Sequence, residues 1–333
     1  MVVIDGHGGY VPRYRVDRDA VASQHGGSAS GESAVPARDE NHVTMASEAA
    51  GNALARADVA GEDLDAVFAA SVSDPFAEHG IAAHVAYRLG ATGDVRTADL
   101  RATPRAATDA LTTARTFVQA TDGAALVVAA DVLPAEPDHD DVATAGAGAG
   151  AVVLRPAAAD PAATVEGVGQ ATTGFVERHR RHGEAAVAGD EKFEATHGFD
   201  PAVESAIERA RDGVEEAPDR GVVGAANRRA AAGALGEFDA EQVSTFDRVG
   251  DAGAASVLVD FAHLLETADA DESALVVAYG AGGADALALS TGPGVGAAGA
   301  RSVETYLDAS EQVSYARHLE YREPVEYEGV TSP

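Results

Sequence analysis

Uninterrupted apolar runs alternate with segments whose apolar positions recur at helical spacing in the first half of the chain. The run at 124–130 (Ala-Ala-Leu-Val-Val-Ala-Ala) is typical of a strand buried on both faces. The pattern predicts strands at 2–4, 65–71, 95–100, 124–130 and 145–154, and helices at about 44–57, 80–89 and 105–121, the first capped by Thr44. This alternation indicates an α/β chain with a buried, largely parallel sheet.

The same order recurs in the second half. After an irregular stretch at about 159–200, the pattern predicts helices at about 201–214, 228–235 and 253–266, and strands near 221–224, 273–279 and 285–290. The run at 275–279 (Leu-Val-Val-Ala-Tyr) repeats the one at 126–130 (Leu-Val-Val-Ala-Ala). We therefore predict a duplicated core in one compact unit, with halves at 1–158 and 159–333, a surface loop at 22–43 and a tail at 325–333.

The net charge of the chain excludes some classes of protein. The chain carries 54 acidic residues against 24 Lys and Arg, a net charge of −30, and Lys192 is its only lysine. Regular apolar segments argue against an acidic disordered chain, so we interpret the charge as a surface adapted to molar salt. Such a field repels nucleic acid, and the sequence has neither a long apolar segment nor a signal peptide. We expect a cytoplasmic protein in a high-salt cytosol, without nucleic-acid or membrane partners.

The chain has no cysteine, which excludes disulfides, thiolate metal sites and Cys-based catalysis. His139, His182 and His197 lie in polar or acidic surroundings without the spacing of metal ligands. We interpret them as surface histidines and expect no metal site.

A bend at 98–108 is the centre of the chemical interpretation. A strand there runs through Thr103-Pro104 into an Ala-rich helix. Thr103 is expected to cap the helix, and Pro104 gives up an N–H that has no partner at the first helical position. Such a helix N-terminus would stabilise a thiolate nucleophile, but Pro104 supplies none.

Several motifs, taken in order, resemble the thiolase superfamily, and within it the archaeal-type 3-hydroxy-3-methylglutaryl-CoA synthases, with ketoacyl-ACP synthase III as a more distant relative. The motifs are Gly9-Tyr10-Val11-Pro12-Arg13-Tyr14-Arg15, Val35-Pro36 through Thr44-Met45-Ala46, Ser71-Val72-Ser73-Asp74-Pro75-Phe76, Ala98-Asp99-Leu100, Tyr279-Gly280-Ala281-Gly282-Gly283, Val303-Glu304 with Tyr306-Leu307, and Val313-Ser314-Tyr315-Ala316. The resemblance implies a five-layered α/β/α/β/α thiolase-like fold, acyl-CoA chemistry and pairing of two subunits through central strands.

The resemblance also implies where the catalytic residues should stand, and this chain departs from the family at each position. Pro104 occupies the Cys position, Val72 the Glu position, Gly224 the His position and Asp251 the Asn position. Two substitutes stay open. Thr103 is either a helix cap or a nucleophile, and Asp251 is either a helix-start residue or an acid/base.

Asn227, Arg228 and Arg229 form a basic spot near the expected CoA entrance, and Gly282 and Gly283 offer bare backbone to a thioester. An ordinary surface role for the arginines and a tight turn for the glycines are the alternatives. We predict a non-catalytic subunit or scaffold of an acyl-CoA-handling complex, with CoA or an acyl-CoA as its ligand. An acyltransferase with rebuilt chemistry and an acyl-CoA-binding module are the other two hypotheses.

The partners implied by the resemblance are a second thiolase-fold subunit, in a homodimer or heterodimer, and a zinc-ribbon/OB-fold protein. Because this chain has no cysteine, zinc ligands of that kind would come from the partner or from a segment beyond Pro333. The ending Thr331-Ser332-Pro333 is typical of a linker.

Overall fold

Two halves of the chain build the same five-stranded arrangement. The computed structural model describes residues 2–74, 76, 78–134, 140–181, 186–296 and 299–322. The first half contributes β1 (Val3–Tyr10), β4 (Ala66–Ser71), β5 (Arg96–Arg101), β6 (Ala125–Val132) and β7 (Ala147–Arg155), and the second β8 (Ala163–Thr172), β11 (Arg220–Gly224), β12 (Glu241–Gln242), β13 (Ser273–Gly280) and β14 (Gly283–Thr291). The ladder order β12-β11-β13-β14-β8-β1-β7-β6-β4-β5 repeats one order in each half. The predicted duplication of the core is confirmed.

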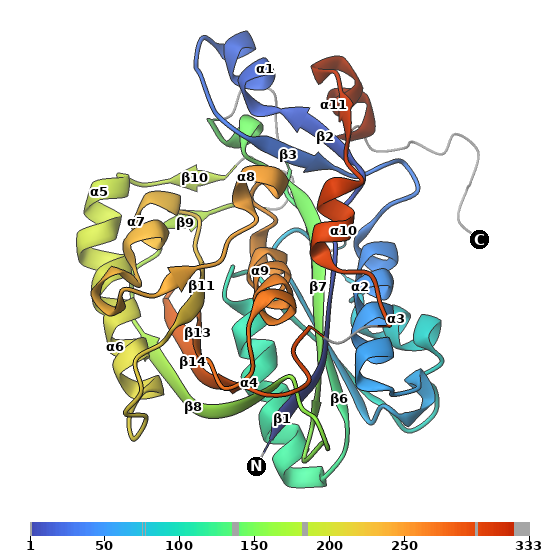
Figure 1. Ribbon diagram of the computed structural model, residues 1–333. Helices are drawn as coiled ribbons and strands as arrows, with labels where there is room; N and C mark the ends of the chain where they lie inside the picture. Colours follow the sequence, from blue (N-terminus) through green and yellow to red (C-terminus); the bar gives the residue numbers. More distant parts are fainter. Residues whose placement is uncertain are drawn as a thin grey trace.

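Five layers follow from where the helices lie. The central layer contains α4 (Ala106–Thr121) and α9 (Gly253–Thr267), whose apolar faces share one core with the inner faces of both half-sheets. The first outer layer has α2 (His42–Ala57) and α3 (Ala82–Leu89) over its own core, and the second has α6 (Asp200–Ala210) and α7 (Arg228–Gly233). Figure 1 shows α9 and α4 between the two half-sheets, so the α/β/α/β/α prediction is confirmed.

The sheet is mixed, and the prediction of a largely parallel sheet is wrong. Strand β4 runs parallel to β5 and β6, and β11 runs parallel to β12 and β13. The pairs β1/β7, β6/β7, β13/β14, β8/β14 and β1/β8 are antiparallel. Direct connections such as the β13–β14 hairpin need no crossover helix, and each such connection reverses the strand direction.

Strand β1 is longer than the predicted 2–4, because it continues through the glycine-rich segment to Tyr10. The glycines fit the strand for a packing reason. A Cβ on Gly6 or Gly8 would collide with the carbonyl oxygens of Ala53 and Ala49 on α2. Because these glycines have no side chains, α2 can lie close against β1. The glycines therefore serve helix–sheet packing and do not form a turn.

The stretch at 159–200 is not irregular. It contains β8, the short strands β9 (Arg178–His179) and β10 (Val187–Ala188), helix α5 (Glu191–Glu194), a short π-helix (Ala195–Phe199) and the start of α6. Strand β8 lacks an apolar run because Gly167 and Gly169 lie under α6, where a Cβ would collide with the carbonyls of Ala210 and Ala206. Glycines in place of apolar side chains hid this strand from the pattern.

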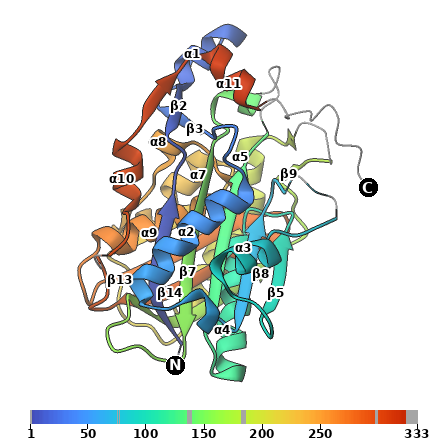
Figure 2. The same cartoon turned by 90° about the vertical axis from the view of Figure 1, so that its right-hand side faces the viewer.

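A small lobe stands at one end of the molecule. It combines β2 (Tyr14–Asp17), β3 (Glu32–Val35) and β15 (Glu311–Val313) with α1 (Arg18–Ala22), a 3-10 turn (Ser23–His25) and α11 (Tyr315–Arg322), and Figure 2 shows it at the top. The lobe corrects the predicted loop at 22–43, because β3 interrupts it with buried Ala34 and Val35. Helix α10 (Val303–Asp308) leads into β15.

The start of α2 also differs from the prediction. The N-cap is Asn41, whose side chain accepts hydrogen bonds from the amides of Val43 and Thr44. Thr44 completes a capping box, because its hydroxyl accepts from the amide of Asn41. Thr44 is therefore part of the cap but is not the capping residue itself.

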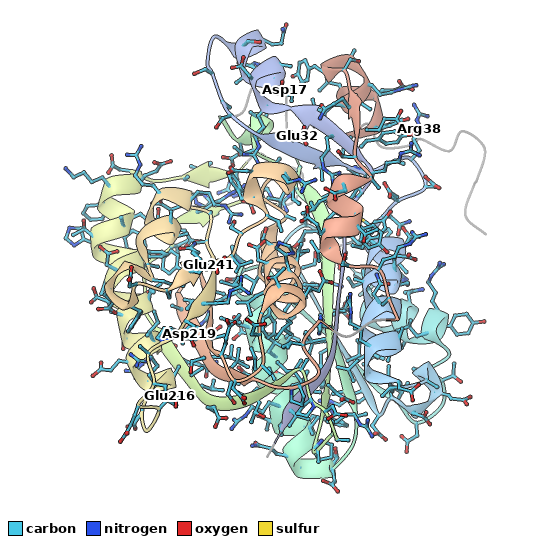
Figure 3. All side chains as sticks on the ribbon, viewed as in Figure 1. Asp17, Glu32, Arg38, Glu216, Asp219 and Glu241 are labelled. Atoms are coloured by element: carbon cyan, nitrogen blue, oxygen red, sulfur yellow. The ribbon has the colours of Figure 1, made fainter. Side chains whose placement is uncertain are left out.

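Charged side chains surround these layers. Figure 3 shows Asp17, Glu32 and Arg38 on the lobe, and Glu216, Asp219 and Glu241 on the second half. No helix in the described ranges is long and apolar enough to cross a membrane.

Candidate functional site

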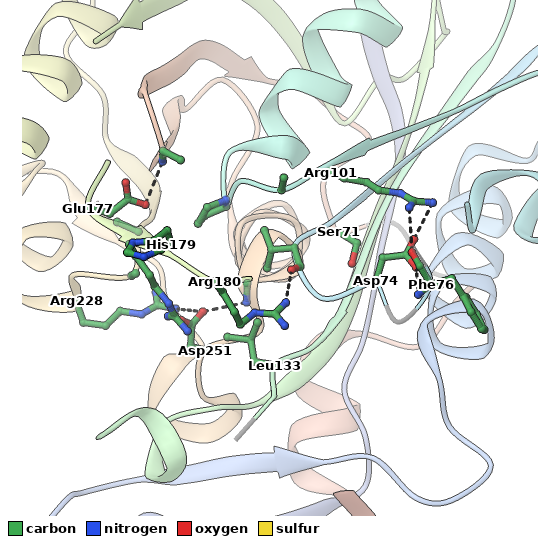
Figure 4. Close-up of a pocket in the computed structure, with 18 residues that line it drawn as sticks. Ser71, Asp74, Phe76, Arg101, Leu133, Glu177, His179, Arg180, Arg228 and Asp251 are labelled. Atoms are coloured by element: carbon green, nitrogen blue, oxygen red, sulfur yellow. Dashed lines mark hydrogen bonds and ion pairs between the residues drawn. The ribbon is translucent and has the colours of Figure 1, made fainter. Parts of the chain in front are cut away.

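A cavity of about 390 Å³ opens where the starts of α4 and α9 meet, and residues from both halves line it (Figure 4). Its lining includes Val72, Pro104, Arg228 and Asp251, which are far apart in sequence. Three of the four substituted positions named above, Val72, Pro104 and Asp251, therefore face one space. The fourth, Gly224, does not line it.

The bend before α4 is held differently from the prediction. The N-cap of α4 is Arg105, whose side chain does not cap the amides of the helix, and the amide of Ala106 donates to the carbonyl oxygen of Thr103 (2.9 Å). The Thr103 hydroxyl is buried and has no hydrogen-bond partner in the described part of the chain. Thr103 is therefore not the helix cap. Ala102 takes a left-handed backbone (φ 75°), a strained conformation for a residue with a Cβ.

Asp285, on β14, anchors the first turn of α4 instead. Its two oxygens accept hydrogen bonds from Arg105 Nη1 (3.0 Å) and Thr108 Oγ1 (2.9 Å). Burial and the nearby Asp109 raise the pKa of Asp285 to about 6, while Arg105 opposes the rise. The bend is thus fixed by a contact between the two halves of the molecule.

The floor of the cavity is a buried polar network around Asp131. Asp131 Oδ1 accepts hydrogen bonds from Ser71 Oγ (2.7 Å), Ser73 Oγ (2.7 Å) and the amides of Val72 and Ser73 (both 2.9 Å), and Oδ2 accepts from the amide of Ala255 (3.3 Å). His42 Nε2 lies 3.0 Å from Ser73 Oγ. Burial raises the pKa of Asp131, and these hydrogen bonds oppose the rise. The network holds the main chain at Val72 in place, because the Val72 amide is one of its donors.

Asp251 makes its contacts through one of its two carboxylate oxygens. Its Oδ1 forms an ion pair with Arg228 Nη2 (3.2 Å) and accepts a hydrogen bond from the amide of Gly253 (2.9 Å) at the start of α9. The guanidinium of Arg228 lies 4.5 Å from the centroid of the Phe246 ring. The guanidinium of Arg18 lies 4.1 Å from the same centroid. These contacts fit the helix-start role that the sequence left open.

One wall of the cavity contains a buried acid that the sequence did not single out. Glu177 Oε1 accepts from the amide of Ala281 (3.0 Å), while its Oε2 has no partner among the described residues. Behind it, Glu194 Oε2 accepts from Asn227 Nδ2 (2.7 Å), and Glu194 Oε1 and the Tyr279 hydroxyl likewise lack a described partner.

These three groups influence one another. Burial raises the pKa of Glu177, and burial together with the charge of Glu177 raises the pKa of Glu194. Burial and the charges of both carboxylates also raise the pKa of Tyr279. The charge of Arg178 opposes the rise at Glu177, and the two neighbouring carboxyl groups disfavour ionisation of both at once.

Relatives of known family resemble this chain over most of their length. The hydroxymethylglutaryl-CoA synthase of Archaeoglobus fulgidus is 30% identical over 309 residues, covering 87% of this chain and 89% of the relative. The chain belongs to the hydroxymethylglutaryl-CoA synthase family. The synthases of Methanopyrus kandleri and Methanocaldococcus jannaschii are 29% and 27% identical, each over 98% of this chain and 98% and 99% of their own length. No family model matches the chain.

Solved structures agree on the fold of this hydroxymethylglutaryl-CoA synthase family member. A hydroxymethylglutaryl-CoA synthase complexed with CoA superposes with a TM-score of 0.81 at 15% identity, over 96% of this chain and 89% of that one. The 3-oxoacyl-[acyl-carrier-protein] synthase III of Aquifex aeolicus gives 0.76 at 20% identity, over 87% and 100%. The thiolase-like fold is therefore shown, and at these identities the superpositions carry the fold alone.

Gly224, where the resemblance places the family His, is not among the residues that line the cavity. A Cβ on Gly224 would collide with the side chain of Val257 on α9. Ala225 and Ala226 line the cavity instead.

Most of the residues predicted to lie on the CoA side make other contacts or lie outside the cavity lining. Asn227 is buried, caps α7 by accepting from the amide of Ala230 (3.1 Å), and donates to Glu194. Arg229 is exposed and does not line the cavity, whereas Arg228 does. Gly282 (φ 92°) and Gly283 (φ 155°) form the tight β13–β14 turn, and a Cβ on Gly283 would collide with the Ala171 carbonyl.

No group of three or more His, Asp or Glu in the described chain is arranged to hold a metal ion. His197 is exposed, with its ring centroid 4.4 Å from that of Phe193. His139 and His182 lie outside the described residues. Sequence reasoning missed two ionisable residues that line the cavity, Glu177 and Arg180. Both come from the segment that was predicted to be irregular. The only feature of the sequence that could have indicated them is the run of ionisable residues Glu-Arg-His-Arg-Arg at 177–181.

Proposed function

We propose that this protein binds an acyl-CoA thioester in the cavity without Cys-dependent condensation, and acts as a non-catalytic subunit of an acyl-CoA-handling assembly. One observation carries the proposal. The cavity of about 390 Å³ persists at the start of α4, yet the residue presented to it there is Pro104. A ligand site of useful size thus coexists with the absence of a thiol nucleophile.

The chemistry of condensation explains why Pro104 matters. A thioester intermediate needs a nucleophile, a group that moves protons and N–H donors aimed at the developing oxyanion. Pro104 has neither a nucleophilic atom nor an N–H, and Val72 carries no proton that can be exchanged. Each requirement fails at the residue that faces the cavity.

The rebuilt-chemistry hypothesis has less support. A nucleophilic Thr103 needs a base within hydrogen-bond reach, and its hydroxyl has no partner in the described residues. Asp251 is held by Arg228 and Gly253. Neither residue has the arrangement of an activated pair.

Subunit pairing is supported by the edge of the sheet. Strand β5 ends the ladder and pairs only with β4 in the described structure, so its outer edge is open to another strand. A second thiolase-fold subunit, identical or related, would add its strand there. The central strands of this chain, β1 and β8, already pair with each other, so the expected pairing through central strands is moved to this edge. A zinc-ribbon/OB-fold partner remains part of the proposal and rests on the family resemblance alone.

Binding and turnover test the first part of the proposal. Calorimetry at high salt should detect binding of CoA and acetyl-CoA, and acetyl-CoA with acetoacetyl-CoA should release no CoA above the buffer rate. Absence of binding heat would remove the ligand role. Turnover that disappears in Asp251→Ala would contradict the non-catalytic role and favour rebuilt chemistry.

Co-purification from the native cell tests the second part. We expect the chain to be recovered with a second thiolase-fold polypeptide or as a homodimer. Recovery only as a free monomer would contradict the subunit role.

A further inference from the structure

Two exposed histidines meet beside the start of α3, outside the lining of the cavity. His79 Nε2 lies 2.7 Å from His84 Nε2, while the centroids of the two rings are 4.3 Å apart and the ring planes are inclined by 38°. Because the two nitrogens are closer to each other than the two centroids are, each ring turns its Nε2 edge toward the other ring. The pair therefore presents two imidazole nitrogens at one place on the surface.

The main chain around this pair is held to the sheet. Asp99 Oδ1, on β5, accepts hydrogen bonds from the amides of Ile81 (2.7 Å) and Ala82 (3.1 Å), which ties the start of α3 to the strand. His84 lies in the first turn of α3, in the outer layer of the first half (Figure 2). His79 precedes this anchor with a φ of 96°, a left-handed conformation that is strained for a residue with a Cβ.

A hydrogen bond between two neutral imidazoles is the ordinary explanation of such a pair. One ring would donate its N–H and the other would accept it, which a separation of 2.7 Å allows. On an exposed surface both rings can bond to water instead, so this hydrogen bond adds little to stability. It gives no reason for the strained backbone of His79 to be retained, because strain of this kind persists where the surroundings or a function require it.

Metal coordination accounts for both the pairing and the strain. Imidazole nitrogen suits Zn²⁺, Ni²⁺ and Cu²⁺, whereas Mg²⁺ and Ca²⁺ prefer oxygen ligands. Two nitrogens that each bind one zinc ion at about 2.0–2.1 Å lie about 3 Å from each other. The observed separation of 2.7 Å is close to this value, and both side chains are exposed and can adjust. The net charge of −30 also attracts cations to the surface of this chain.

We propose that His79 and His84 form a two-histidine site for a divalent transition metal ion of the zinc type, with water completing its coordination. No group of three or more His, Asp or Glu in the described chain is arranged to hold a metal ion, so the site takes two ligands from the protein. The ion joins the residue before the Asp99 anchor to the first turn of α3. It thereby holds the main chain of His79 in its strained conformation. This inference does not depend on the proposed acyl-CoA-binding function.

The site lies next to the cavity without being part of it. The ring of His79 packs edge-on against the ring of Phe76, with 5.2 Å between the centroids, and Phe76 is an exposed residue of the cavity lining. An ion bound at His79 is therefore in contact, through one aromatic ring, with the edge of the cavity.

Calorimetry with zinc chloride tests the inference on the full chain after removal of metals by a chelator, at high salt. Wild type should bind one zinc ion, and magnesium chloride should give no comparable binding. His79→Gln and His84→Gln should each weaken zinc binding by at least about 10-fold, because even the loss of a group behind a metal ligand costs about 10- to 100-fold. His197→Gln removes an exposed histidine elsewhere on the surface and should bind zinc as wild type does.

Two further measurements locate the ion. Added zinc should raise the unfolding midpoint of wild type more than that of His84→Gln, because an ion that binds the folded chain stabilises it. Anomalous scattering from crystals grown with zinc should place the ion between the Nε2 atoms of His79 and His84.

Three results would overturn the inference. Wild type that binds no zinc would leave a hydrogen-bonded pair of imidazoles. Zinc binding that is unchanged in both variants, or an ion found among surface carboxylates, would show that the acidic surface supplies the ligands. Weaker binding in one variant alone would mean that one histidine suffices. Equal unfolding midpoints of wild type and the variants without zinc check that the substitutions leave the fold intact.

Discussion

The floor and the wall of the cavity both contain buried carboxyl groups, but the two regions differ in how completely those groups are hydrogen-bonded. On the floor, Asp131 accepts hydrogen bonds at both oxygens. On the wall, Glu177 and Glu194 each keep one oxygen without a partner in the described structure, as does Tyr279. A satisfied buried network rigidifies a fold, whereas unsatisfied polar groups cost stability and are retained where a ligand or a proton uses them. On this comparison the floor is structural, and we propose that the wall is the part of the site available for binding.

Removing the floor carboxylate should have the largest effect. Asp131→Ala takes this acceptor from the hydroxyls of Ser71 and Ser73 and from three amides, so we expect a loss of about 4 kcal/mol in unfolding free energy. Urea denaturation at constant high salt measures it. Asp131→Asn keeps one acceptor oxygen and should lose about half as much. A loss below about 1 kcal/mol in the alanine variant would remove the distinction between floor and wall.

Asp285 sharpens the comparison because it combines features of both regions. Its oxygens are both hydrogen-bonded, yet its pKa is raised from 3.8 to about 6. A raised folded-state pKa stabilises the protein at low pH, and this contribution is lost as pH rises through the folded value. Relative to Asp285→Asn, wild type should lose roughly 3 kcal/mol of stability between about pH 4 and pH 6. A constant difference between the two proteins over this range would contradict the assignment.

Glu177 should affect pH dependence more than stability. Its pKa is raised by burial, so its contribution is present at low pH and is lost as pH rises through the raised folded value. Glu177→Gln keeps an acceptor for Ala281, and we expect its unfolding free energy at neutral pH to lie within about 1 kcal/mol of wild type. Stability measured across pH should show wild type weakening relative to the variant as pH increases. The reverse slope would mean that Glu177 is stabilised as a carboxylate.

Pro104→Cys should have the smallest effect, because no CoA release should appear. The variant regains a thiol and an N–H, but Val72 still cannot exchange a proton and Asp251 is still bound to Arg228. Wild type has no cysteine, so labelling by a thiol reagent would verify that the new side chain is accessible. CoA release by this single variant would show that the remaining machinery is intact.

The sequence predicted the repeated elements well because buried strands and helices impose periodic apolar patterns. The duplicated order of strands and helices and most helix positions followed from that pattern, whereas the five layers were implied by the family resemblance. It failed where packing uses glycine, at β1 and β8, since Gly6, Gly8, Gly167 and Gly169 mark close helix approach without any apolar signal.

The candidate site was predicted in part. The positions of Val72, Pro104 and Asp251 came from the family resemblance, and the structure places all three at one cavity. Glu177, Arg180 and Asp131 were missed because their importance depends on burial and on partners distant in sequence. The local sequence pattern contains no such information. It also predicted Thr103 as the cap of α4, whereas Asp285 holds the first turn of that helix.

Mass spectrometry of the chain after incubation with acetyl-CoA tests the central claim most directly. Under native conditions the account predicts a complex of the chain with intact acetyl-CoA, and after denaturation the mass of the unmodified chain. An acetylated chain after denaturation would show that a nucleophile survives in the cavity and would contradict the account. Absence of the native complex would contradict it as well, because the cavity would then not hold its proposed ligand.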